Sequence, residues 1–600
     1  MIRTLLRLSV VLGVLPLMSL GCAFVSPVEK DISPDIRSSF FKAPPGTLDL
    51  RAISQGVHVF GASQDAPGPA GGMLGIGLAF GDFNGDGKDD LAIGAPSFPN
   101  LQDAETPPSG PGGVYLLFGR TTLPTLNDLP NQADVILVAE TASVGYEVAF
   151  GDLNGDGLED LIIGAPWGAG FVPYRKDREG VVAVVFGRRN FAGTHSLGQV
   201  ADVLISGANK SDFAGAALAI GDFNGDGLGD LLIGAPMGSA LGTFERGSAG
   251  AAYLLLGRRQ WPKTLDLAQE SSIAIFGAVG GDRAGTAVAL SDVTGDGLAD
   301  IIVGAPLADW VIEEDVRIRR VCGAVYLVKG RVEIPDQIDL STEADSTIYG
   351  TEKGDGAGWS LATGDFNGDG TADVVIGAPL ARHKNIRRKD DIFNLIGGNF
   401  RADLGLAAAR RRVTGHAEGE VYLLWGRPDW PALLDLGNKA NVTLYGTPFE
   451  ESQEVYLIAQ AGGDAGYAIA MGDVNGDGRL DLIVGAPFGD GKEPLRRDAG
   501  LVHVVLGTDR VRRTIGLETF STHLVVGSNK RYRLGTTLAA GDFDGDGKDE
   551  LALAEPRASE LDNEKLLRGR VYLIKSLPIG ANAEKAITKQ KALHKPTLAP

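Results

Sequence analysis

Seven copies of one short, acidic and glycine-rich segment recur along this 600-residue chain. The copies begin at Asp82, Asp152, Asp222, Asp292, Asp365, Asp473 and Asp542. Successive starts are 70, 70, 70, 73, 108 and 69 residues apart, so the spacing is regular except for one insertion before the sixth copy. Seven similar units of this length predict either a solenoid or a propeller.

Each unit also contains four strand-like segments. In the first unit these are residues 77–80, 91–93, 114–118 and 135–138. Four short strands per repeat is the composition of a propeller blade, and large all-β folds of this kind keep hundreds of residues in one domain. The 85 glycines agree with short strands joined by tight turns.

The two ends of the repeat region favour a closed ring. The last unit stops after its third strand, at 571–574, whereas residues 48–50 and 57–62 match the fourth strand of other units, for example 265–267 and 273–278. Pairing the ends would remove the open sheet edge that a solenoid leaves exposed. The sequence therefore predicts an all-β, seven-bladed β-propeller over residues 48–576, with four-stranded antiparallel blades and an N-terminal strand that completes the last blade.

The repeated loop has the chemistry of a cation site. The first copy reads Asp-Phe-Asn-Gly-Asp-Gly-Lys-Asp-Asp from residue 82. Oxygen-bearing side chains at positions 1, 3, 5 and 9, with a carbonyl at position 7, are ligands that Ca²⁺ requires. An EF-hand would carry a glutamate at position 12, but position 12 here is the apolar Ile93. Mg²⁺, which prefers a stricter octahedron with retained waters, is the alternative ion. A single copy could be a solvated turn, but seven copies favour up to seven Ca²⁺ sites.

The candidate metal ligands occupy positions 1, 3, 5, 7 and 9 of each copy, position 7 through its carbonyl oxygen. They are Asp82, Asn84, Asp86, Lys88, Asp90, Asp152, Asn154, Asp156, Leu158, Asp160, Asp222, Asn224, Asp226, Leu228, Asp230, Asp292, Thr294, Asp296, Leu298, Asp300, Asp365, Asn367, Asp369, Thr371, Asp373, Asp473, Asn475, Asp477, Arg479, Asp481, Asp542, Asp544, Asp546, Lys548 and Glu550. The fourth copy has Thr294 and the seventh has Asp544 at position 3, so these two sites are expected to differ in affinity. The net charge is −20, and seven Ca²⁺ ions would bring +14 and leave −6. This acidity argues against a nucleic-acid partner.

These motifs resemble the FG-GAP repeats of integrin α chains. The resemblance rests on the loops, on Phe-Gly at 60–61 and 276–277, and on Gly-Ala-Pro after the second strand of six units, and it covers about residues 48–576. It implies a seven-bladed propeller, calcium in the hairpin between the first two strands of a blade, and a role in adhesion or ligand recognition. The seventh unit departs, with Ala554-Glu555-Pro556. An inserted adhesion domain and downstream leg domains are not found, so integrin-like heterodimerisation is not expected.

The loops between the second and third strands are expected on the face opposite the calcium loops, because strands in a blade alternate in direction. They are long, basic and aromatic, and the insertion at 380–418 is one of them. Binding residues often lie on variable loops of a rigid scaffold, although charged loops are often simply solvated. The candidate ligand-binding residues, for an unknown protein or an anionic glycan, are Trp167, Arg175, Trp310, Arg319, Arg387, Arg388, Arg410 and Arg411.

Residues 1–22 have the pattern of an export signal, with early arginines, an apolar run and a final Gly21-Cys22. Cys22 resembles the lipidated cysteine of bacterial lipoproteins, although residues 19 and 20 depart from the usual order, and ordinary cleavage nearby is the alternative. We expect an exported protein of the cell envelope or exterior, anchored to the membrane if Cys22 is lipidated. Residues 23–47 then form a flexible tether and 577–600 a flexible tail. Cys322 has no other cysteine to pair with, so packing and metal must supply the stability.

The sequence therefore predicts a calcium-binding adhesion or ligand-recognition module, with no catalytic residues and no enzymatic activity. The alternatives are a propeller enzyme, such as a polysaccharide lyase or hydrolase, and a purely structural envelope scaffold. The seven histidines show no metal-ligand spacing, and the common hydrolase and phosphate-loop motifs are not found.

Overall fold

The structure, a computed structural model, describes residues 46–51, 57–61, 73–96, 112–122, 126–139, 143–168, 178–239, 246–312, 317–381, 417–446, 463–491, 496–509, 514–558, 569–575 and 577. The predicted export signal with Cys22, almost all of the predicted tether, most of the insertion at 380–418 and almost all of the C-terminal tail lie outside these residues.

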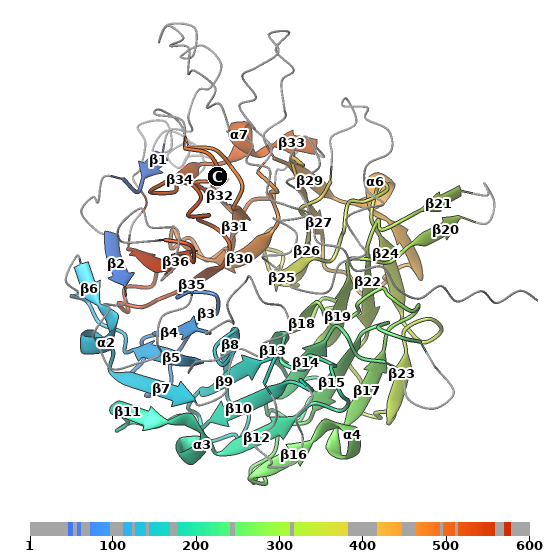
Figure 1. The fold of residues 1–600 in the computed structure, drawn as a ribbon. Helices are drawn as coiled ribbons and strands as arrows, with labels where there is room; N and C mark the ends of the chain where they lie inside the picture. The colour runs from blue at the N-terminus through green and yellow to red at the C-terminus, as the bar shows by residue number, and fades with distance from the viewer. Residues whose placement is uncertain are drawn as a thin grey trace, which may run out of the picture. The chain divides into compact units, whose positions relative to one another are not determined.

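Seven sheets form the blades of a ring (Figure 1). Blades 1 to 3 consist, in pairing order, of β3 (Leu78–Gly81), β4 (Asp90–Ala95), β5 (Gly112–Leu117), β7 (Val135–Ala139) and β11 (Gly193–Ser196); β8 (Glu147–Gly151), β9 (Asp160–Ala165), β10 (Val181–Val185), β12 (Val203–Ser206) and β16 (Thr264–Asp266); and β13 (Ala217–Gly221), β14 (Asp230–Ala235), β15 (Ala251–Leu255), β17 (Ile273–Phe276) and β23 (Gln337–Asp339).

Blades 4 to 7 follow the same order. They consist of β18 (Ala287–Ser291), β19 (Asp300–Ala305), β22 (Ala324–Val328), β24 (Ser346–Tyr349) and β28 (Leu433–Asp435); β25 (Ser360–Gly364), β26 (Asp373–Ala378), β27 (Glu420–Leu424), β29 (Val442–Tyr445) and β33 (Thr514–Gly516); β30 (Ala468–Gly472), β31 (Asp481–Ala486), β32 (Leu501–Val505), β34 (His523–Val526) and β1 (Gly46–Asp49); and β35 (Leu538–Gly541), β36 (Glu550–Glu555), β37 (Arg570–Ile574), β2 (Val57–Gly61) and β6 (Leu126–Asp128).

The ring closes as the sequence predicts. β2 pairs antiparallel with β37, with Val57 opposite Ile574 and Phe60 opposite Val571, so a strand from the N-terminal part completes the last blade. In Figure 1, β2, in blue, accordingly lies beside the red strands of the other end of the chain, near the label β36. The first strands of neighbouring blades contact one another around the whole ring. The seven-bladed, all-β fold is therefore confirmed.

The blades differ from the prediction in one respect, because each sheet has a fifth strand. Four strands pair antiparallel, and a short fifth strand pairs parallel with the fourth; β16, for example, pairs with β12 of the preceding blade. The sequence pattern 265–267 looked like part of its own unit's fourth strand. It instead covers the outer edge of the neighbouring sheet, whose backbone N–H and C=O groups would otherwise lie unpaired.

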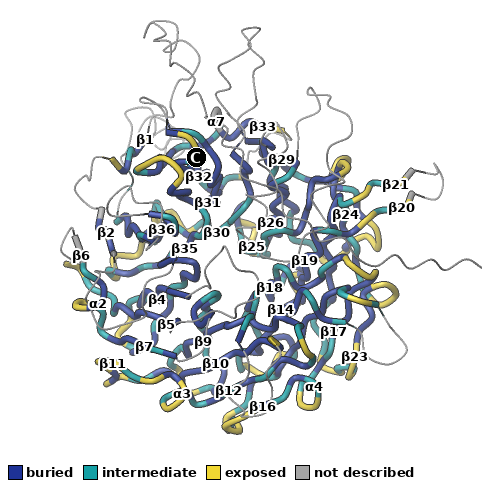
Figure 2. The backbone as a smooth tube through the Cα atoms, in the orientation of Figure 1, coloured by how far each residue is buried: buried dark blue, intermediate teal, exposed yellow. Residues whose placement is uncertain are grey.

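The core lies between neighbouring sheets. The second strand of every blade is buried along its whole length. Figure 2 shows these strands in dark blue, with exposed residues mainly in turns and in outer strands such as β11. Strands covered on both faces need continuous apolar runs, which is why this strand reads Asp-Leu-Ile-Ile-Gly-Ala in blade 2.

Helices are minor elements. Those in the described part of the chain are the single turns α2 (Leu129–Gln132), α3 (Leu197–Val200), α4 (Leu267–Glu270), α6 (Leu436–Lys439) and α7 (Leu517–Phe520). Among the described residues, no helix has the length and the apolar run needed to cross a membrane. A separate hairpin, β20 (Trp310–Ile312) with β21 (Arg317–Arg319), rises from the connection between the second and third strands of blade 4.

The glycine of the repeated Gly-Ala-Pro motif is explained by close approach between blades. A Cβ atom at Gly234 would overlap the carbonyl oxygen of Gly285 in the next blade, and the same overlap recurs for the equivalent glycines of the other Gly-Ala-Pro units. At the junction between blades 7 and 1 the corresponding residue is Ala554, whose Cβ lies against Gly75. A glycine faces this position at the other junctions too, so no substitution across the junction compensates for Ala554.

We predict that Gly234→Ala lowers the free energy of unfolding by about 1–3 kcal/mol, because the added methyl group forces two backbones apart. Gly247→Ala is the matched control in the same blade, since its Cβ would have no atom within 4 Å. Urea unfolding of both variants checks the prediction. Equal midpoints for the two variants would contradict it.

Candidate metal sites in the seven repeat loops

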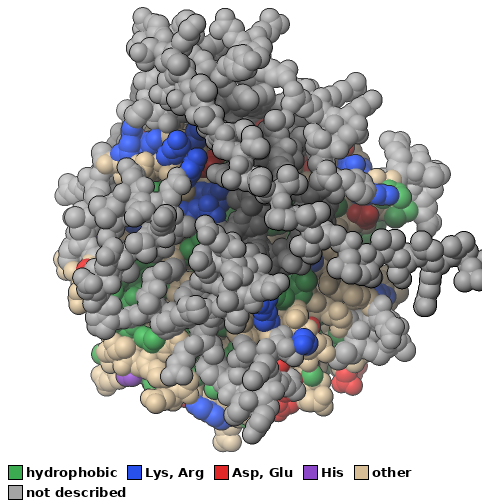
Figure 3. All heavy atoms as spheres, in the orientation of Figure 1, with side chains coloured by type: hydrophobic (Ala, Val, Ile, Leu, Met, Phe, Trp, Pro, Cys, Tyr) green, Lys and Arg blue, Asp and Glu red, His purple; other side chains and the backbone are tan. Residues whose placement is uncertain are grey.

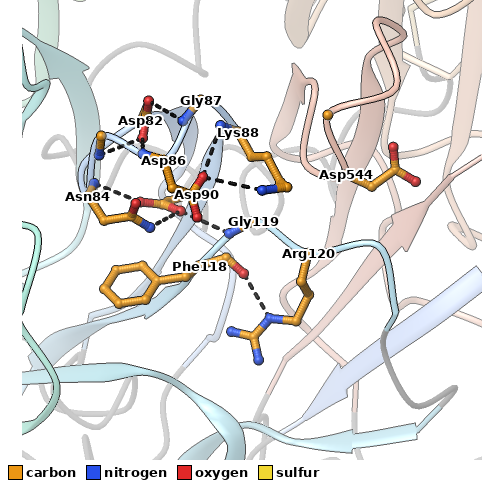
Figure 4. A network of polar contacts seen from close by, with 12 residues as sticks. Asp82, Asn84, Asp86, Gly87, Lys88, Asp90, Phe118, Gly119, Arg120 and Asp544 are labelled. Carbon is orange, nitrogen blue, oxygen red and sulfur yellow. Dashed lines mark hydrogen bonds and ion pairs between the residues drawn. The ribbon is translucent and has the colours of Figure 1, made fainter.

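The first aspartate of each loop holds the loop backbone in shape. In the first loop, Gly85 and Asp86 donate their N–H groups to Asp82 Oδ1 at 2.7 and 3.0 Å, and Gly87 donates to Oδ2 at 2.9 Å (Figure 4). Gly85 and Gly87 have φ of 70° and 83°, a conformation that favours glycine. The same three bonds recur in the other six loops.

The ninth residue anchors the loop to the sheet. Asp90 is 0% exposed; its Oδ2 accepts the N–H of Asn84 at 3.2 Å and its Oδ1 accepts the N–H of Gly119, just past the third strand, at 2.8 Å (Figure 4). The bond from the glycine after the third strand recurs in the next five blades. One buried carboxylate thus joins the loop to the third strand.

Burial, together with the nearby loop carboxylates, raises the pKa of these ninth residues. It raises the pKa of Asp90, Asp160 and Asp481 to about 7, and that of Asp230, Asp300 and Asp373 to about 6. In the first six loops the described partners of these carboxylates are amide N–H groups rather than cationic side chains. A buried carboxylate among other carboxylates is costly unless a cation offsets its charge.

The donor set of each loop fits a hard divalent cation. The side chains at positions 1, 5 and 9 offer carboxylate oxygens, and position 7 offers its carbonyl. Asn84 points its amide nitrogen at Asp90 Oδ1, at 3.2 Å, so its amide has to turn over before its oxygen can serve as a ligand. In the fourth loop, Thr294 Oγ1 lies 3.4 Å from Asp292 Oδ1 and is already an oxygen.

The loops also form the junctions between blades. The N–H of the eighth residue donates to the carbonyl of the first loop residue in the preceding blade, as from Asp549 to Asp473 at 3.0 Å, and this bond recurs at five further junctions. At three consecutive junctions the eighth side chain is acidic and accepts the N–H of that same first residue: Asp549 from Asp473 at 2.7 Å, Asp89 from Asp542 at 2.9 Å, and Glu159 from Asp82 at 3.0 Å. These three junctions surround the point where the ring closes.

In two blades, a second contact joins the loop to the neighbouring blade. Arg258 N and Trp261 Nε1, which follow the third strand of blade 3, both donate to the carbonyl of Leu153 at 3.1 Å in the loop of blade 2. The Arg258 guanidinium stacks 4.6 Å from the Trp261 ring. Arg427 and Trp430 of blade 5 repeat the arrangement on Val293 of blade 4. Sequence reasoning missed this contact, although the pattern Gly-Arg-x-x-Trp is visible in both blades.

The seventh loop departs from the others in its side chains. Asp542, Asp544 and Glu550 each bring a carboxylate oxygen within 4.8 Å of the other two. Burial, with Asp544 nearby, raises the pKa of Glu550 to about 8. Lys575 Nζ lies 2.9 Å from Asp544 Oδ2, and Asp544 Oδ1 is buried without a hydrogen-bond partner.

The structure describes three of the predicted ligand-binding residues on the opposite face, and they have intramolecular contacts. Trp167 packs edge-on against Tyr146 and Phe213. Trp310 stacks on Tyr349 with ring centroids 5.0 Å apart. Arg175, Arg387, Arg388, Arg410 and Arg411 lie outside the described residues.

Arg319 belongs to a repeated clasp that sequence reasoning did not find. Its guanidinium donates to Gly350 O and to both carboxylate oxygens of Asp435, at 2.8 and 3.0 Å, and lies 4.5 Å from the Trp310 ring. Arg246 likewise donates to both carboxylate oxygens of Asp339, and Arg496 donates to Oδ2 of Asp49. Each arginine holds the aspartate at or near the end of a fifth strand. The recurring Leu-Asp-Leu or Ile-Asp-Leu of these strands was the only signal for the partner.

Comparison with known proteins agrees with this architecture. The FG-GAP repeat model matches residues 74–117, 144–185, 214–255, 284–327, 357–387, 465–505 and 534–574. The chain is an integrin-α-like FG-GAP β-propeller. It is 30% identical to integrin alpha-PS2 of Drosophila melanogaster over 318 residues, covering 49% of this chain and 20% of the relative. It is 29% identical to integrin alpha-V of Gallus gallus over 245 residues, covering 39% and 20%. These likenesses support an exported, ligand-binding propeller and divalent-cation binding.

A second group of relatives corrects one prediction. The chain is 29% identical over 373 residues to phosphatidylinositol-glycan-specific phospholipase D of Homo sapiens, covering 57% of this chain and 43% of that protein. The chain thus spans less than half of the length of these relatives. The prediction that the chain is not an enzyme is wrong, because relatives that match its repeats are named as an enzyme and so point toward enzymatic activity.

Proposed function

We propose that this protein is an exported, calcium-dependent ligand-recognition or adhesion module of the cell envelope. Ca²⁺ in up to seven loops rigidifies the ring, and the opposite face binds a protein or an anionic glycan. The observation that carries the proposal is that each loop combines a buried carboxylate with backbone bonds to the next blade. A cation at the loop would therefore stabilise both a blade and a junction.

The residues that would hold the ion are the loop ligands at positions 1, 3, 5, 7 and 9. Bound Ca²⁺ would supply positive charge to carboxylates that burial now disfavours in their ionised form. The glycines at positions 4 and 6 keep the loop curled around this point. Anchoring of the envelope form through Cys22 is part of the same proposal.

We predict that the wild-type protein binds up to seven Ca²⁺ ions and that Asp226→Ala removes one of them. Asp226 is exposed at position 5, where Leu228 donates to its Oδ1 at 2.9 Å, so its loss changes the calcium-free stability little. An ion that binds only the folded state stabilises it by about 2.7 kcal/mol at 100 times its Kd. Isothermal titration and thermal unfolding, with and without EGTA, measure both effects.

The control for this test is Asp429→Ala, an exposed acid outside the loops. It is expected to bind as many ions as the wild type. Little calcium binding by the wild type would contradict the metal part of the proposal.

The ligand-binding face carries a basic cluster among the described residues. Arg497 lies between the second and third strands of blade 6, and Lys530 and Arg531 lie between blades 6 and 7; all three are exposed. Arg531 donates its N–H to Arg497 O at 2.8 Å, so the two connections lie side by side. Figure 3 shows Lys and Arg side chains gathered over β1 and β34. Three adjacent cations on a chain of net charge −20 favour an anionic ligand.

We predict that reversing these charges, in Arg497→Glu/Lys530→Glu/Arg531→Glu, weakens binding to immobilised heparin or polyglutamate by roughly tenfold or more. Binding by the wild type should also weaken as salt rises, because salt screens exposed charges. Arg259→Glu, an exposed charge on the calcium-loop face, serves as control and should bind normally. An unchanged affinity in the triple variant would rule out this cluster as the ligand site.

A second candidate function is cleavage of a phosphatidylinositol-glycan, either by this chain or by a larger protein that contains it. The similarity to phosphatidylinositol-glycan-specific phospholipase D over 373 residues favours this candidate. Incubation of the full chain with a glycolipid-anchored protein in detergent, followed by phase separation, tests it. Release of the anchored protein into the aqueous phase is expected if the chain is itself the enzyme. Retention in the detergent phase would contradict activity of this chain alone.

A further inference from the structure

The seventh loop has a cationic side chain where most other blades have an apolar one. Lys575 directly follows the third strand of blade 7, β37. The equivalent residues of blades 1 to 6 are Phe118, Phe186, Leu256, Lys329, Trp425 and Leu506. Lys329 donates to Pro428 O at 2.9 Å, so the lysine of blade 4 is directed to a backbone carbonyl. Among these seven described residues, only Lys575 of blade 7 is bonded to a loop carboxylate.

The ammonium group of Lys575 joins the two blades that close the ring. Its Nζ donates to Asp544 Oδ2 at 2.9 Å in the seventh loop, and to Thr121 O at 2.7 Å after the third strand of blade 1. The side chains of Lys575 and Asp544 are only 17% and 15% exposed. Water therefore screens this ion pair less than it would screen a surface pair.

The charge of Lys575 matches a second change in the same loop. Position 3 is neutral in the other loops, as Asn or Thr, but is Asp544 in the seventh. The seventh loop also has Glu550 at position 9, and Ser576 takes the place in the sequence of the glycine that binds this position in blades 1 to 6. The extra negative charge and the added ammonium group thus occur together, in direct contact.

We propose that Lys575 is a built-in counter-ion of the seventh loop, which holds the closing junction together without Ca²⁺ and weakens Ca²⁺ binding at this loop relative to the others. A positive charge beside a ligand carboxylate offsets repulsion between the carboxylates when no ion is bound, and repels the ion when one arrives. This inference rests on the proposed calcium function of the loops. It makes the junction between blades 7 and 1 the part of the ring that depends least on calcium.

The test compares Lys575→Met with Lys329→Met, which removes the equivalent lysine of blade 4. Thermal unfolding is measured in EGTA and in saturating Ca²⁺, and Ca²⁺ binding is followed by isothermal titration. Lys575→Met is expected to lower the Tm in EGTA, to recover most of that loss in Ca²⁺, and to tighten the weakest Ca²⁺ site. Lys329→Met should change the Tm equally in both conditions.

A double variant, Lys575→Met/Asp544→Asn, gives the loop the neutral position 3 of the other loops. It should regain stability in EGTA relative to Lys575→Met, because the uncompensated carboxylate is gone. An equal loss of Tm with and without Ca²⁺ in Lys575→Met, with no rescue by Asp544→Asn, would overturn the inference and leave Lys575 a packing residue. Absence of Ca²⁺ binding at every loop of the wild type would instead overturn the proposed function, and the rescue in EGTA would still decide whether Lys575 is a counter-ion.

Discussion

The ring depends on one buried carboxylate per blade, the ninth residue of each loop. In blade 3 this is Asp230, which accepts the N–H of Phe223 from the loop and the N–H of Gly257 from the residues after the third strand, both at 2.8 Å. These two bonds fix the loop against its own sheet. The loop can then reach the neighbouring blade, because the N–H of Ala299 in blade 4 donates to Asp222 O at 2.8 Å. The same nine residues therefore make the bonds that hold the loop to its own blade and the bonds that hold it to the next blade.

This coupling explains why the acidic loops and the close-packed glycines belong together. Gly234 permits the backbone of one blade to approach Gly285 of the next on the face opposite the loops, while the loops join the same blades on their own face. Each junction is thus held at both ends. A backbone contact needs no ion, whereas carboxylates crowded in a loop repel one another unless a cation is present. Calcium would therefore control only one end of each junction, and the apolar core between the sheets would persist without it.

Much of the fold could be predicted from the repeats, whereas fewer of the side-chain contacts could be predicted from the sequence. Seven loops at nearly constant spacing, with residues 57–62 matching a fourth strand, were enough to predict the closed ring. The fifth strands were missed because a parallel pairing with the preceding blade leaves no pattern within one repeat. Arg319 looked like a ligand-binding residue because it lies on a variable loop, but its partner Asp435 is 116 residues away. The contact of Lys575 was overlooked for a similar reason, because its partner Asp544 is 31 residues away and only the fold places the two side by side.

The two faces of the ring consequently differ in how strongly their residues are constrained, and this favours a different role for each face. The connections on the loop face are short, repeat from blade to blade and make many hydrogen bonds, so a substitution in one of them affects a junction between blades. The opposite face carries connections of variable length, including the hairpin of β20 and β21. Val311 and Ile318 in this hairpin are 58% and 50% exposed, so the hairpin adds little to the core of the blade. Arginine clasps such as Arg246 with Asp339 secure the base of these connections. Because the base is held and the tips are unconstrained by the repeat, the sequence of the tips can change on this face while the ring beneath them stays the same, which is what the proposed ligand-binding function requires.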